Sequence, residues 1–466
     1  MKKIRSRVGL CTLILLLFIV GLGILLISYF RNARKWFLTP YNRHQYTADN
    51  ALMSGTIVDR NGVLLSYAAD GVRRFSDDAA TRLATLHVVG DAEGKIGTSA
   101  LSTMRKYLVN FTPAIGVSSV TEKGNTVSLS IDANLNRVAY DALAGRNGTV
   151  CVYNRKTGEI LALVSTPVFD PADIPADLEQ NAAYEGAYIN RFYSSTATPG
   201  SVMKTVILQA ALEQLTASDI DSAQTGPIEN CIFRCDGHFE LPDGTVNCTA
   251  KHGAQTLSEA FANSCNCVFA QLAVALSPDT VSAYTNKAGL TASYKIGSVS
   301  TARGVFEFSG IPQFRLGYAG IGLYHDQVNP CSLLVYYAAI AEGGSAAIPT
   351  TLLSAADTGG NVFYRPTTSF SPVLIEKNTA ATIRKMLENN VVKTYGADRF
   401  PCKIAAKSGT ISRGNGKSDC WFAGFTAEDR LPYAFVVYIE HGGSGSADAG
   451  DVAAKVLRAL CGSSGK

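Results

Sequence analysis

The longest hydrophobic stretch of the chain lies close to its N-terminus. No charged residue occurs between Val8 and about Phe30. About 22 apolar residues, at about 1.5 Å each, are enough to cross the roughly 30 Å hydrocarbon core of a bilayer. The stretch is longer than the apolar part of a cleaved signal peptide, and Leu26 to Phe30 offers no small-x-small cleavage site. We therefore expect an uncleaved membrane-spanning helix at residues 8–30.

Basic residues flank this helix on both sides. Four precede it, namely Lys2, Lys3, Arg5 and Arg7, whereas three follow it, namely Arg31, Arg34 and Lys35. Positive charge favours the cytoplasmic side of a membrane. The pattern predicts a cytoplasmic tail at residues 1–7 and a single-pass cell-membrane protein with its body outside the cytoplasm.

Beyond the anchor, the apolar runs alternate between strand-like and helix-like patterns. Five strand-like runs are predicted to pair in one sheet, at 148–153, 160–164, 403–408, 419–425 and 433–439. The last three are consecutive, with a turn at 413–416 and a polar break at 427–430, so antiparallel pairing is expected. Helical spacing predicts helices from about Ser201 to Thr216 and from Ala449 to about Leu460. The expected fold class is α/β, with a five-stranded antiparallel sheet covered by helices.

Two extracytoplasmic parts are expected. Residues 31–125 contain a polar connector and then a small, mainly-β module, with a strand near Gly55–Asp59 and a turn at Arg60–Gly62. Residues 126–466 form a larger domain. With 466 residues, 47% hydrophobic and 17% charged, the chain can fill more than one core. Its net charge of +4 comes from dispersed cations, which argues against a nucleic-acid partner.

Three short motifs carry candidate chemistry in a fixed order. They are Ser201-Val202-Met203-Lys204, Ser264-Cys265-Asn266 and Lys407-Ser408-Gly409-Thr410. The pattern S-x-x-K, S-x-N, K-[ST]-G occurs in serine acyl-transferases that attack D-alanyl peptides or β-lactam rings. A hydroxyl and an amine three residues apart share one face of a helix, so Lys204 can serve as the base for Ser201. That role needs a lowered lysine pKa, and Lys407 is a candidate for the second positive charge that lowers it.

Two further matches are decoys. Lys156-Thr157-Gly158 precedes the candidate nucleophile and is predicted to be a hairpin turn between two strands. Ser463-Ser464-Gly465-Lys466 lies in a Gly/Ser tail that has no helix to align the pair. Order, spacing and predicted local structure therefore select Ser201, Lys204, Ser264, Asn266 and Lys407.

With these motifs the chain resembles the class B penicillin-binding proteins, which are membrane-anchored peptidoglycan D,D-transpeptidases. The likeness extends to the segments 55–65, 157–162, 165–171, 190–191, 198–201, 252–253 and 421–425. It implies a penicillin-recognising transpeptidase domain on a pedestal. Ser54 and the segment 100–102 depart from the usual family pattern, which puts contacts of the pedestal in question and leaves the chemistry intact.

The resemblance also implies a role for each motif residue. Ser201 is the nucleophile and Lys204 its base, while Ser264 relays a proton and Asn266 orients the substrate and Lys204. Lys407 stands behind the substrate-binding residues, which are Ser408, Gly409 and Thr410. The implied substrates are peptidoglycan stem peptides, the implied inhibitors are β-lactam antibiotics, and the implied partner is a polytopic membrane glycan polymerase. No cofactor is implied.

Alternative functions use the same residues. A D,D-carboxypeptidase would pass the acyl group to water, and a β-lactamase would need a deacylating base that the sequence does not reveal. A β-lactam sensor or scaffold would bind without cross-linking. Sensors usually have more membrane segments and a cytoplasmic signalling module, whereas one span and a seven-residue cytoplasmic tail are expected here. A scaffold would be expected to lose Ser201 or Lys204, and both are present.

The eleven cysteines raise one metal hypothesis. Cys231-x3-Cys235-x12-Cys248-x3-His252 has a spacing that a zinc site would accept. A Cys235–Cys248 disulfide and free thiols are the competing interpretations on an external domain. His252-Gly253 matches a family segment that carries no metal, so no metal is expected. Cys265 and Cys267 are assigned packing roles.

Overall fold

The structure is a computed structural model that describes residues 2–37, 52, 54–109, 124–414 and 416–463. Most of the expected connector and part of the expected pedestal, residues 110–123, lie outside the described residues. So do Asn415 of the expected turn and Lys466 of the second S-x-x-K match.

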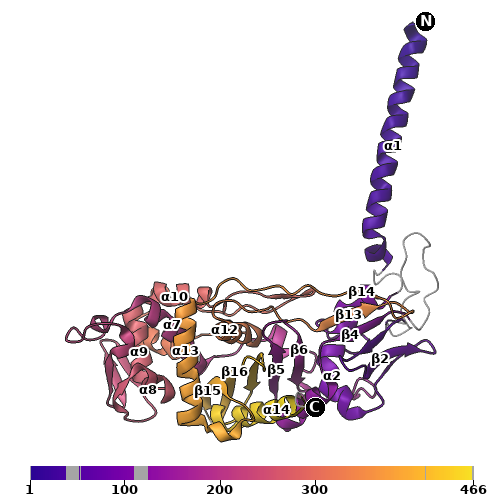
Figure 1. Ribbon diagram of the computed structural model, residues 1–466. Helices are drawn as coiled ribbons and strands as arrows, with labels where there is room; N and C mark the ends of the chain where they lie inside the picture. The colour runs from indigo at the N-terminus through magenta and orange to yellow at the C-terminus, as the bar shows by residue number, and fades with distance from the viewer. Residues whose placement is uncertain (1, 38–51, 53, 110–123, 415, 464–466) are drawn as a thin grey trace.

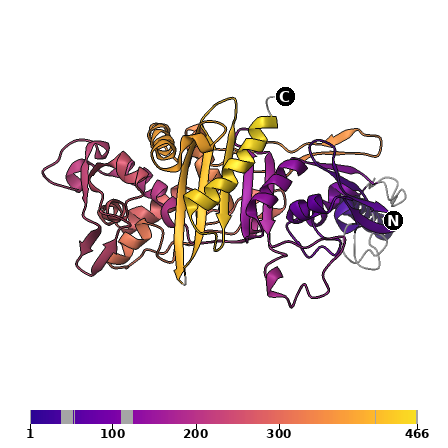
Figure 2. The ribbon, with the colours of Figure 1, turned by 90° about the horizontal axis from the view of Figure 1, so that it is seen from below.

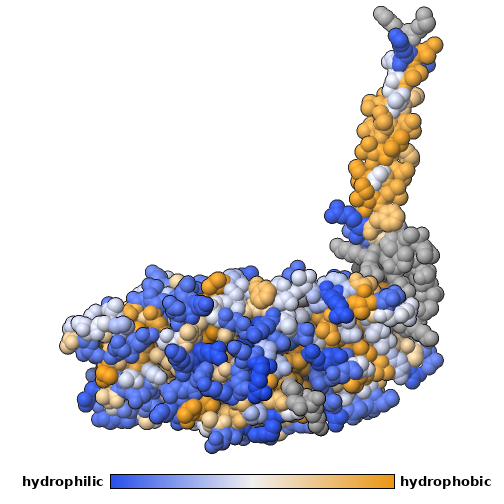
Figure 3. Space-filling view, viewed as in Figure 1, coloured by the Kyte–Doolittle hydropathy of each residue, from blue (hydrophilic) through white to orange (hydrophobic). Residues whose placement is uncertain are grey.

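The N-terminal hydrophobic stretch forms the long helix α1 (Lys2–Phe37). Figure 3 shows a mostly hydrophobic surface along the middle of this helix, between hydrophilic ends, in contrast to the mixed surface of the body. Within the described residues, Lys3–Ala33 is the one helix long and apolar enough to cross a membrane. The helix expected at residues 8–30 is therefore present, and its length and composition fit a single membrane span.

A six-stranded sheet forms the end of the body labelled β2, β4 and β13 in Figure 1. Its strand order is β14-β13-β4-β1-β2-β3, with β1 (Thr56–Val58), β2 (Leu64–Ala69), β3 (Val72–Phe75), β4 (Thr126–Leu129), β13 (Leu352–Ala356) and β14 (Val362–Tyr364). β1 and β4 are parallel and the other pairs are antiparallel. The sheet thus takes β4, β13 and β14 from beyond residue 125, where the larger domain was expected to begin.

The second large sheet has the five strands that the sequence predicted. Its order is β15-β16-β17-β5-β6, with β5 (Gly148–Asn154), β6 (Ile160–Thr166), β15 (Ile404–Gly414), β16 (Lys417–Thr426) and β17 (Tyr433–Ile439). All four pairings are antiparallel. Residues 155–159 link β5 to β6, so the first K-T-G match is a hairpin turn as expected. β15 lies at an open edge of this sheet.

Alternating side chains give this sheet two buried faces. Val150 and Val152 of β5 pack with α5 (Ala133–Leu143) and α14 (Gly450–Ser463), and α14 crosses the sheet in Figure 2. Cys151 and Tyr153 point to the opposite face, which packs with α12 (Pro330–Glu342). A sheet covered by helices on both faces holds β15 in a fixed position.

A mainly helical lobe lies beside the β15 edge (Figure 1). Its helices are α7 (Lys204–Gln214), α8 (Leu257–Ala262), α9 (Asn266–Leu276), α10 (Pro278–Lys287), α11 (Gln313–Gly320) and α13 (Lys377–Asn390). Its short strands are β7 (Ile232–Cys235), β8 (His238–Leu241), β9 (Gly244–Asn247) and β10 (Gly253–Thr256), where β7 pairs with β10 and β8 with β9. The remaining elements are α2 (Ala79–Val89), α3 (Ala100–Thr103), α4 (Arg105–Leu108), α6 (Arg191–Ser194), β11 (Lys295–Ile296) and β12 (Val299–Ser300).

Candidate active site

The three motifs meet where the helical lobe contacts the edge of the five-stranded sheet. Ser201 lies in the 3₁₀ turn Gly200–Val202, directly before α7. Ser264 lies between α8 and α9, and Asn266 is the first residue of α9. Lys407 and the three residues after it belong to β15. Segments about 60 and 140 residues apart in sequence thus contribute to one site.

The turn that carries Ser201 is fixed by backbone contacts on both sides. The Trp421 indole donates a hydrogen bond to the carbonyl of Thr198 (2.9 Å), and the N–H of Gly200 donates to the carbonyl of Gly322 (2.9 Å). A Cβ atom at Gly409 would lie 2.9 Å from the carbonyl oxygen of Pro199 and 3.5 Å from the Ser201 nitrogen. The glycine of the K-S-G motif therefore permits β15 to approach Ser201, the expected nucleophile.

The Lys204 side chain is fully buried and bonded to the S-x-N segment. Its ammonium donates to the Ser264 carbonyl (2.5 Å), to Ser264 Oγ (3.2 Å) and to Asn266 Oδ1 (2.7 Å). In the described part of the chain these hydrogen bonds go to the S-x-N segment, not to the Ser201 hydroxyl. Burial, with a smaller effect from the positive charge of Lys407, lowers the pKa of Lys204 to about 7. A neutral amine is therefore accessible near neutral pH, as a general base requires.

Lys407 approaches the same serine from β15. Its ammonium donates to Ser264 Oγ (3.0 Å), and burial lowers the pKa of Lys407 to about 7. Ser264 thus lies between two amines, and its hydroxyl links them. Such a hydroxyl can accept a proton from one amine and pass a proton to a leaving group.

The expected substrate-binding residues, Ser408 to Thr410, follow Lys407 along the strand. Ser408 is half-buried and Thr410 is exposed, and the Thr410 hydroxyl accepts a hydrogen bond from the N–H of Gly445 (2.9 Å). Hydroxyls beside a buried amine are suited to binding a carboxylate. A separate cavity of about 650 Å³ lies between the two sheets, lined by residues such as Tyr107, Thr350 and Tyr364. None of the motif residues lines that cavity.

Tyr395 is a site residue that the sequence did not single out. Its hydroxyl accepts a hydrogen bond from the N–H of Ser408 (3.0 Å) and lies 3.1 Å from Ser408 Oγ and 3.5 Å from Lys407 Nζ. It stands at the end of the π-helical turn Val391–Tyr395, which follows α13. No motif marks this position, and only the packing of that turn against β15 brings the hydroxyl to the site.

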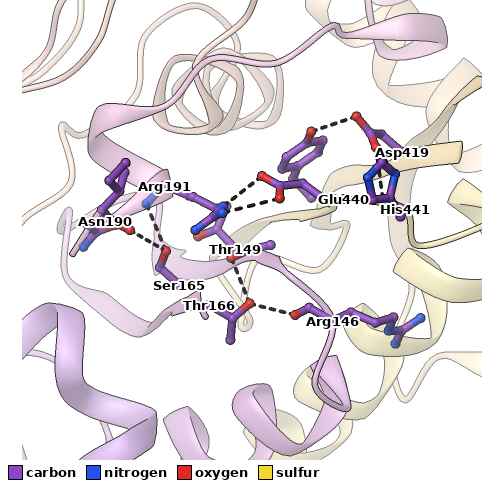
Figure 4. A network of polar contacts seen from close by, with 12 residues as sticks. Arg146, Thr149, Ser165, Thr166, Asn190, Arg191, Asp419, Glu440 and His441 are labelled. Atoms are coloured by element: carbon purple, nitrogen blue, oxygen red, sulfur yellow. Dashed lines mark hydrogen bonds and ion pairs between the residues drawn. The ribbon is translucent and has the colours of Figure 1, made fainter. Parts of the chain in front are cut away.

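A second polar network supports the segment that leads to the nucleophile. Arg191 binds Glu440 (Nε to Oε1, 2.9 Å), and the N–H of Arg191 donates to Ser165 Oγ (3.0 Å), as Figure 4 shows. The Thr166 hydroxyl donates to the carbonyl of Arg146 (2.7 Å). These contacts fix the segment 190–191, one of those that carried the family resemblance, to the sheet.

The structure corrects the predicted metal candidates. Cys235, Cys248 and His252 lie together, but the fourth member of the group is Cys265 and not Cys231. Cys231 and Cys235 are separated by the extended strand β7, so their Cα atoms are about 13 Å apart. The described cysteines are free thiols, and Cys235 and Cys248 form no disulfide. Cys265, to which only packing was assigned, therefore belongs to a cluster of polar donors.

Comparison with known proteins identifies the family. The family described as "Penicillin binding protein transpeptidase domain" matches residues 148–462. The chain therefore belongs to the penicillin-binding protein transpeptidase family, which confirms the family and the serine-transpeptidase class that the motifs predicted.

Two curated relatives and two solved structures extend this comparison. The peptidoglycan D,D-transpeptidase PbpA of Mycobacterium tuberculosis is 27% identical over 371 residues, which are 72% of this chain and 72% of that protein. The peptidoglycan D,D-transpeptidase FtsI of Escherichia coli is 23% identical over 366 residues, which are 74% of this chain and 57% of that protein. A D,D-transpeptidase domain from Eggerthella lenta has a TM-score of 0.72 at 25% identity, over 88% of this chain and 99% of that chain. The structure of PBPA from Mycobacterium tuberculosis has a TM-score of 0.74 at 21% identity, over 88% of this chain and 99% of that chain.

Proposed function

We propose that this chain cross-links peptidoglycan stem peptides through an acyl-enzyme on Ser201. The observation that carries the proposal is the contact of two buried lysines, Lys204 and Lys407, with Ser264 beside the turn that holds Ser201. Relatives that are named peptidoglycan D,D-transpeptidases support the choice of substrate.

Acylation begins when neutral Lys204 takes the proton of the Ser201 hydroxyl. Ser201 Oγ then attacks the carbonyl carbon between two D-alanines of a stem peptide, and the backbone N–H groups of Ser201 and Thr410 stabilise the oxyanion. Ser264 passes its hydroxyl proton to the departing D-alanine amine and takes the proton held by Lys204 in its place, the C–N bond breaks, and a Ser201 ester remains. An amine of a second stem attacks this ester, forms the new amide and returns the Ser201 hydroxyl.

The neighbouring residues orient the donor peptide. The Asn266 amide, which also accepts a hydrogen bond from Lys204, aligns the peptide backbone. Ser408, Gly409 and Thr410 bind the terminal carboxylate, and Lys407 supplies positive charge behind them. A β-lactam places its carboxylate and its strained amide in the same positions and acylates Ser201.

The products of a defined reaction test this function. The full chain in detergent is given a stem peptide that ends in D-alanyl-D-alanine, together with an acceptor peptide that bears a free amine. We expect a cross-linked dimer and one released D-alanine per bond. Release of D-alanine without dimer would favour the carboxypeptidase, and turnover of penicillin without a persistent ester would favour the β-lactamase.

The setting of the enzyme is part of the proposal. Residues 1–7 are a cytoplasmic tail, residues 8–30 the membrane anchor, residues 31–125 the connector and pedestal, and residues 126–466 the catalytic domain outside the cytoplasm. β4, β13 and β14 tie the catalytic domain to the pedestal sheet. A C-terminal alkaline phosphatase fusion, which is active only outside the cytoplasm, tests this topology; an inactive fusion at normal expression would reverse it.

A membrane-embedded glycan polymerase is the proposed partner, because the enzyme needs nascent strands whose stems it can join. α1 and the pedestal are the parts closest to the membrane. In-cell crosslinking from α1 is expected to capture such a polymerase. If a variant with an unrelated apolar helix in place of α1 captures the polymerase equally well, the contact does not depend on the sequence of the anchor.

A further inference from the structure

Three thiols and one imidazole converge behind the S-x-N segment. The ligand atoms of Cys235, Cys248, His252 and Cys265 all lie within 4.8 Å of one another. Cys235 is the last residue of β7, Cys248 follows β9, and His252 precedes β10. Cys265 is the N-cap of α9. Three stretches of the chain, namely the end of β7, the loop 248–252 and the start of α9, thus deliver four donor atoms to the same point.

The spacing of these atoms agrees with tetrahedral zinc. At Zn–S and Zn–N distances of about 2.3 and 2.05 Å, tetrahedral geometry places two sulfurs about 3.8 Å apart and a sulfur and a nitrogen about 3.6 Å apart. Cys248 Sγ lies 3.8 Å from Cys265 Sγ and 3.6 Å from His252 Nδ1. These two separations match tetrahedral geometry, and the other donor atoms lie within 4.8 Å, close enough for one ion to bind all four.

A disulfide accounts for this arrangement less well. The S–S bond is about 2.05 Å long and joins only two sulfurs. Even if Cys248 bonded to Cys265 and Cys235 to its neighbour Cys267, the His252 imidazole 3.6 Å from Cys248 Sγ would have no role, whereas a zinc ion uses it as a ligand. Magnesium and calcium prefer oxygen ligands, whereas thiolates with an imidazole select zinc.

We infer that Cys235, Cys248, His252 and Cys265 form a structural zinc site. Four protein ligands close the coordination sphere, so the ion has no open position for substrate or water. Cys267 also contacts Cys235 and Cys248, but it lies outside the group of four and supports their packing. The buried apolar residues of the β7–β10 region, Phe233 and Val246, belong to the main core, and the ion would further join these strands to α9.

This site positions the S-x-N segment, because Cys265 lies between Ser264 and Asn266. The N–H of Asn266 donates to Cys248 Sγ (3.2 Å), while its side-chain oxygen accepts from Lys204 (2.7 Å). Ser264 has a φ of 52°, a conformation that a serine rarely adopts without support. The zinc ligands therefore fix the backbone of Ser264 and Asn266, which accept the hydrogen bonds of Lys204.

Metal analysis of the full chain tests the inference independently of any activity. The protein is purified from membranes in detergent with a tag that contains no histidine, and its zinc is measured by mass spectrometry. We expect about one zinc per chain, lost in Cys248→Ser and in His252→Ala. Cys231→Ser is the matched control: it removes a buried thiol from the same strand region and should keep the metal.

Cobalt exchange on the wild-type chain covers the case in which a ligand variant fails to fold. Bound Co²⁺ should give a thiolate charge-transfer band and the visible spectrum of a tetrahedral ion. A metal-free wild-type chain with a Cys248–Cys265 linked peptide would overturn the inference. So would loss of zinc from Cys267→Ser combined with retention in His252→Ala.

The positioning role has its own measurement. Removal of zinc by a chelator should slow acylation by a fluorescent penicillin by about tenfold or more, and added zinc should restore the rate. Unchanged acylation by chain that has verifiably lost its zinc would overturn the positioning role. Absent acylation in zinc-loaded wild type would instead count against the proposed function.

Discussion

The segment Ser264–Asn266 faces two different chemical environments. On one side, two buried ammonium groups meet oxygen acceptors at 2.5–3.2 Å. On the other side, the thiol of Cys265 meets another sulfur at 3.8 Å in a cluster of soft donors. The first side satisfies its polar groups with hydrogen bonds from the protein, whereas the second is completed by a metal. Residues 264–266 thus connect the two lysines of the candidate active site to the thiol cluster.

Substitutions on the two sides of this segment should have different effects. A change on the lysine side should stop the chemistry and leave the fold and the zinc in place. A change on the thiol side should lower zinc content, stability and acylation together. The following variants test this separation, beginning with the largest expected effect.

Lys204→Met is expected to lower the acylation rate constant by about 10³-fold, because a general base contributes about 10²–10⁴. Methionine is similar in length; it loses the hydrogen bonds of the amine but also removes the cost of burying a charge, so the melting temperature should change little. Stopped-flow measurement with a fluorescent penicillin gives the rate. A loss of less than tenfold would mean that another group takes the Ser201 proton.

The pH profile of acylation should follow the two lysines. Lys204, with a pKa of about 7, is active when neutral, so the rate should fall about tenfold per pH unit below that value. Lys407, also with a pKa of about 7, loses its charge above that pH, so the acylation rate should fall again and the profile should be bell-shaped. Lys407→Gln should keep only the rising limb and move its midpoint to higher pH, because one cause of the lowered Lys204 pKa is gone. A flat profile from about pH 5 to 9 would contradict both assignments.

Tyr395→Phe should slow acylation by roughly tenfold. The N–H of Ser408 loses its acceptor, and an unsatisfied buried group costs about 1–3 kcal/mol. The acylation rate and the melting temperature should both fall, with zinc content unchanged. Tyr337→Phe is the control, since that buried hydroxyl bonds Thr205 and not the K-S-G strand. Equal acylation rates in the two variants would remove Tyr395 from the site.

Glu440→Gln should have the smallest effect. It weakens the pairing with Arg191 shown in Figure 4, where the two side chains are 9% and 32% exposed. A partly exposed pair contributes at most about 1 kcal/mol. Urea unfolding should show that small loss of stability, and acylation should change less than twofold. A large loss of acylation would mean that the segment before Ser201 controls the chemistry.

The sequence predicted the elements whose signal is local. Short, nearly continuous apolar runs located all five strands of the central sheet, and consecutive strands implied their antiparallel order. The three motifs selected residues that the fold brings together, because each motif is short and occupies one turn or one strand. The pedestal sheet was less predictable. Its partners β13 and β14 come from more than 220 residues further along the chain than β4, and no local pattern encodes that pairing.

The errors have similar physical causes. The C-x3-C spacing suggested Cys231 as a ligand, but an extended strand separates it from Cys235. The structure brings in Cys265 instead, from a motif already assigned to catalysis. Tyr395 was missed because its contact with Ser408 depends on a π-helical turn. The rise per residue of an extended strand could have flagged the first error, whereas the other two depend on tertiary packing.

The central claim is that Ser201 is the nucleophile, and the site of acylation tests it most directly. Full-length chain is treated with penicillin, digested and analysed by mass spectrometry, with Ser194→Ala as the matched control for Ser201→Ala. We expect one adduct on the peptide that contains Ser201, present in Ser194→Ala and absent in Ser201→Ala. An adduct that persists in Ser201→Ala, or one located on Ser264, would contradict the account.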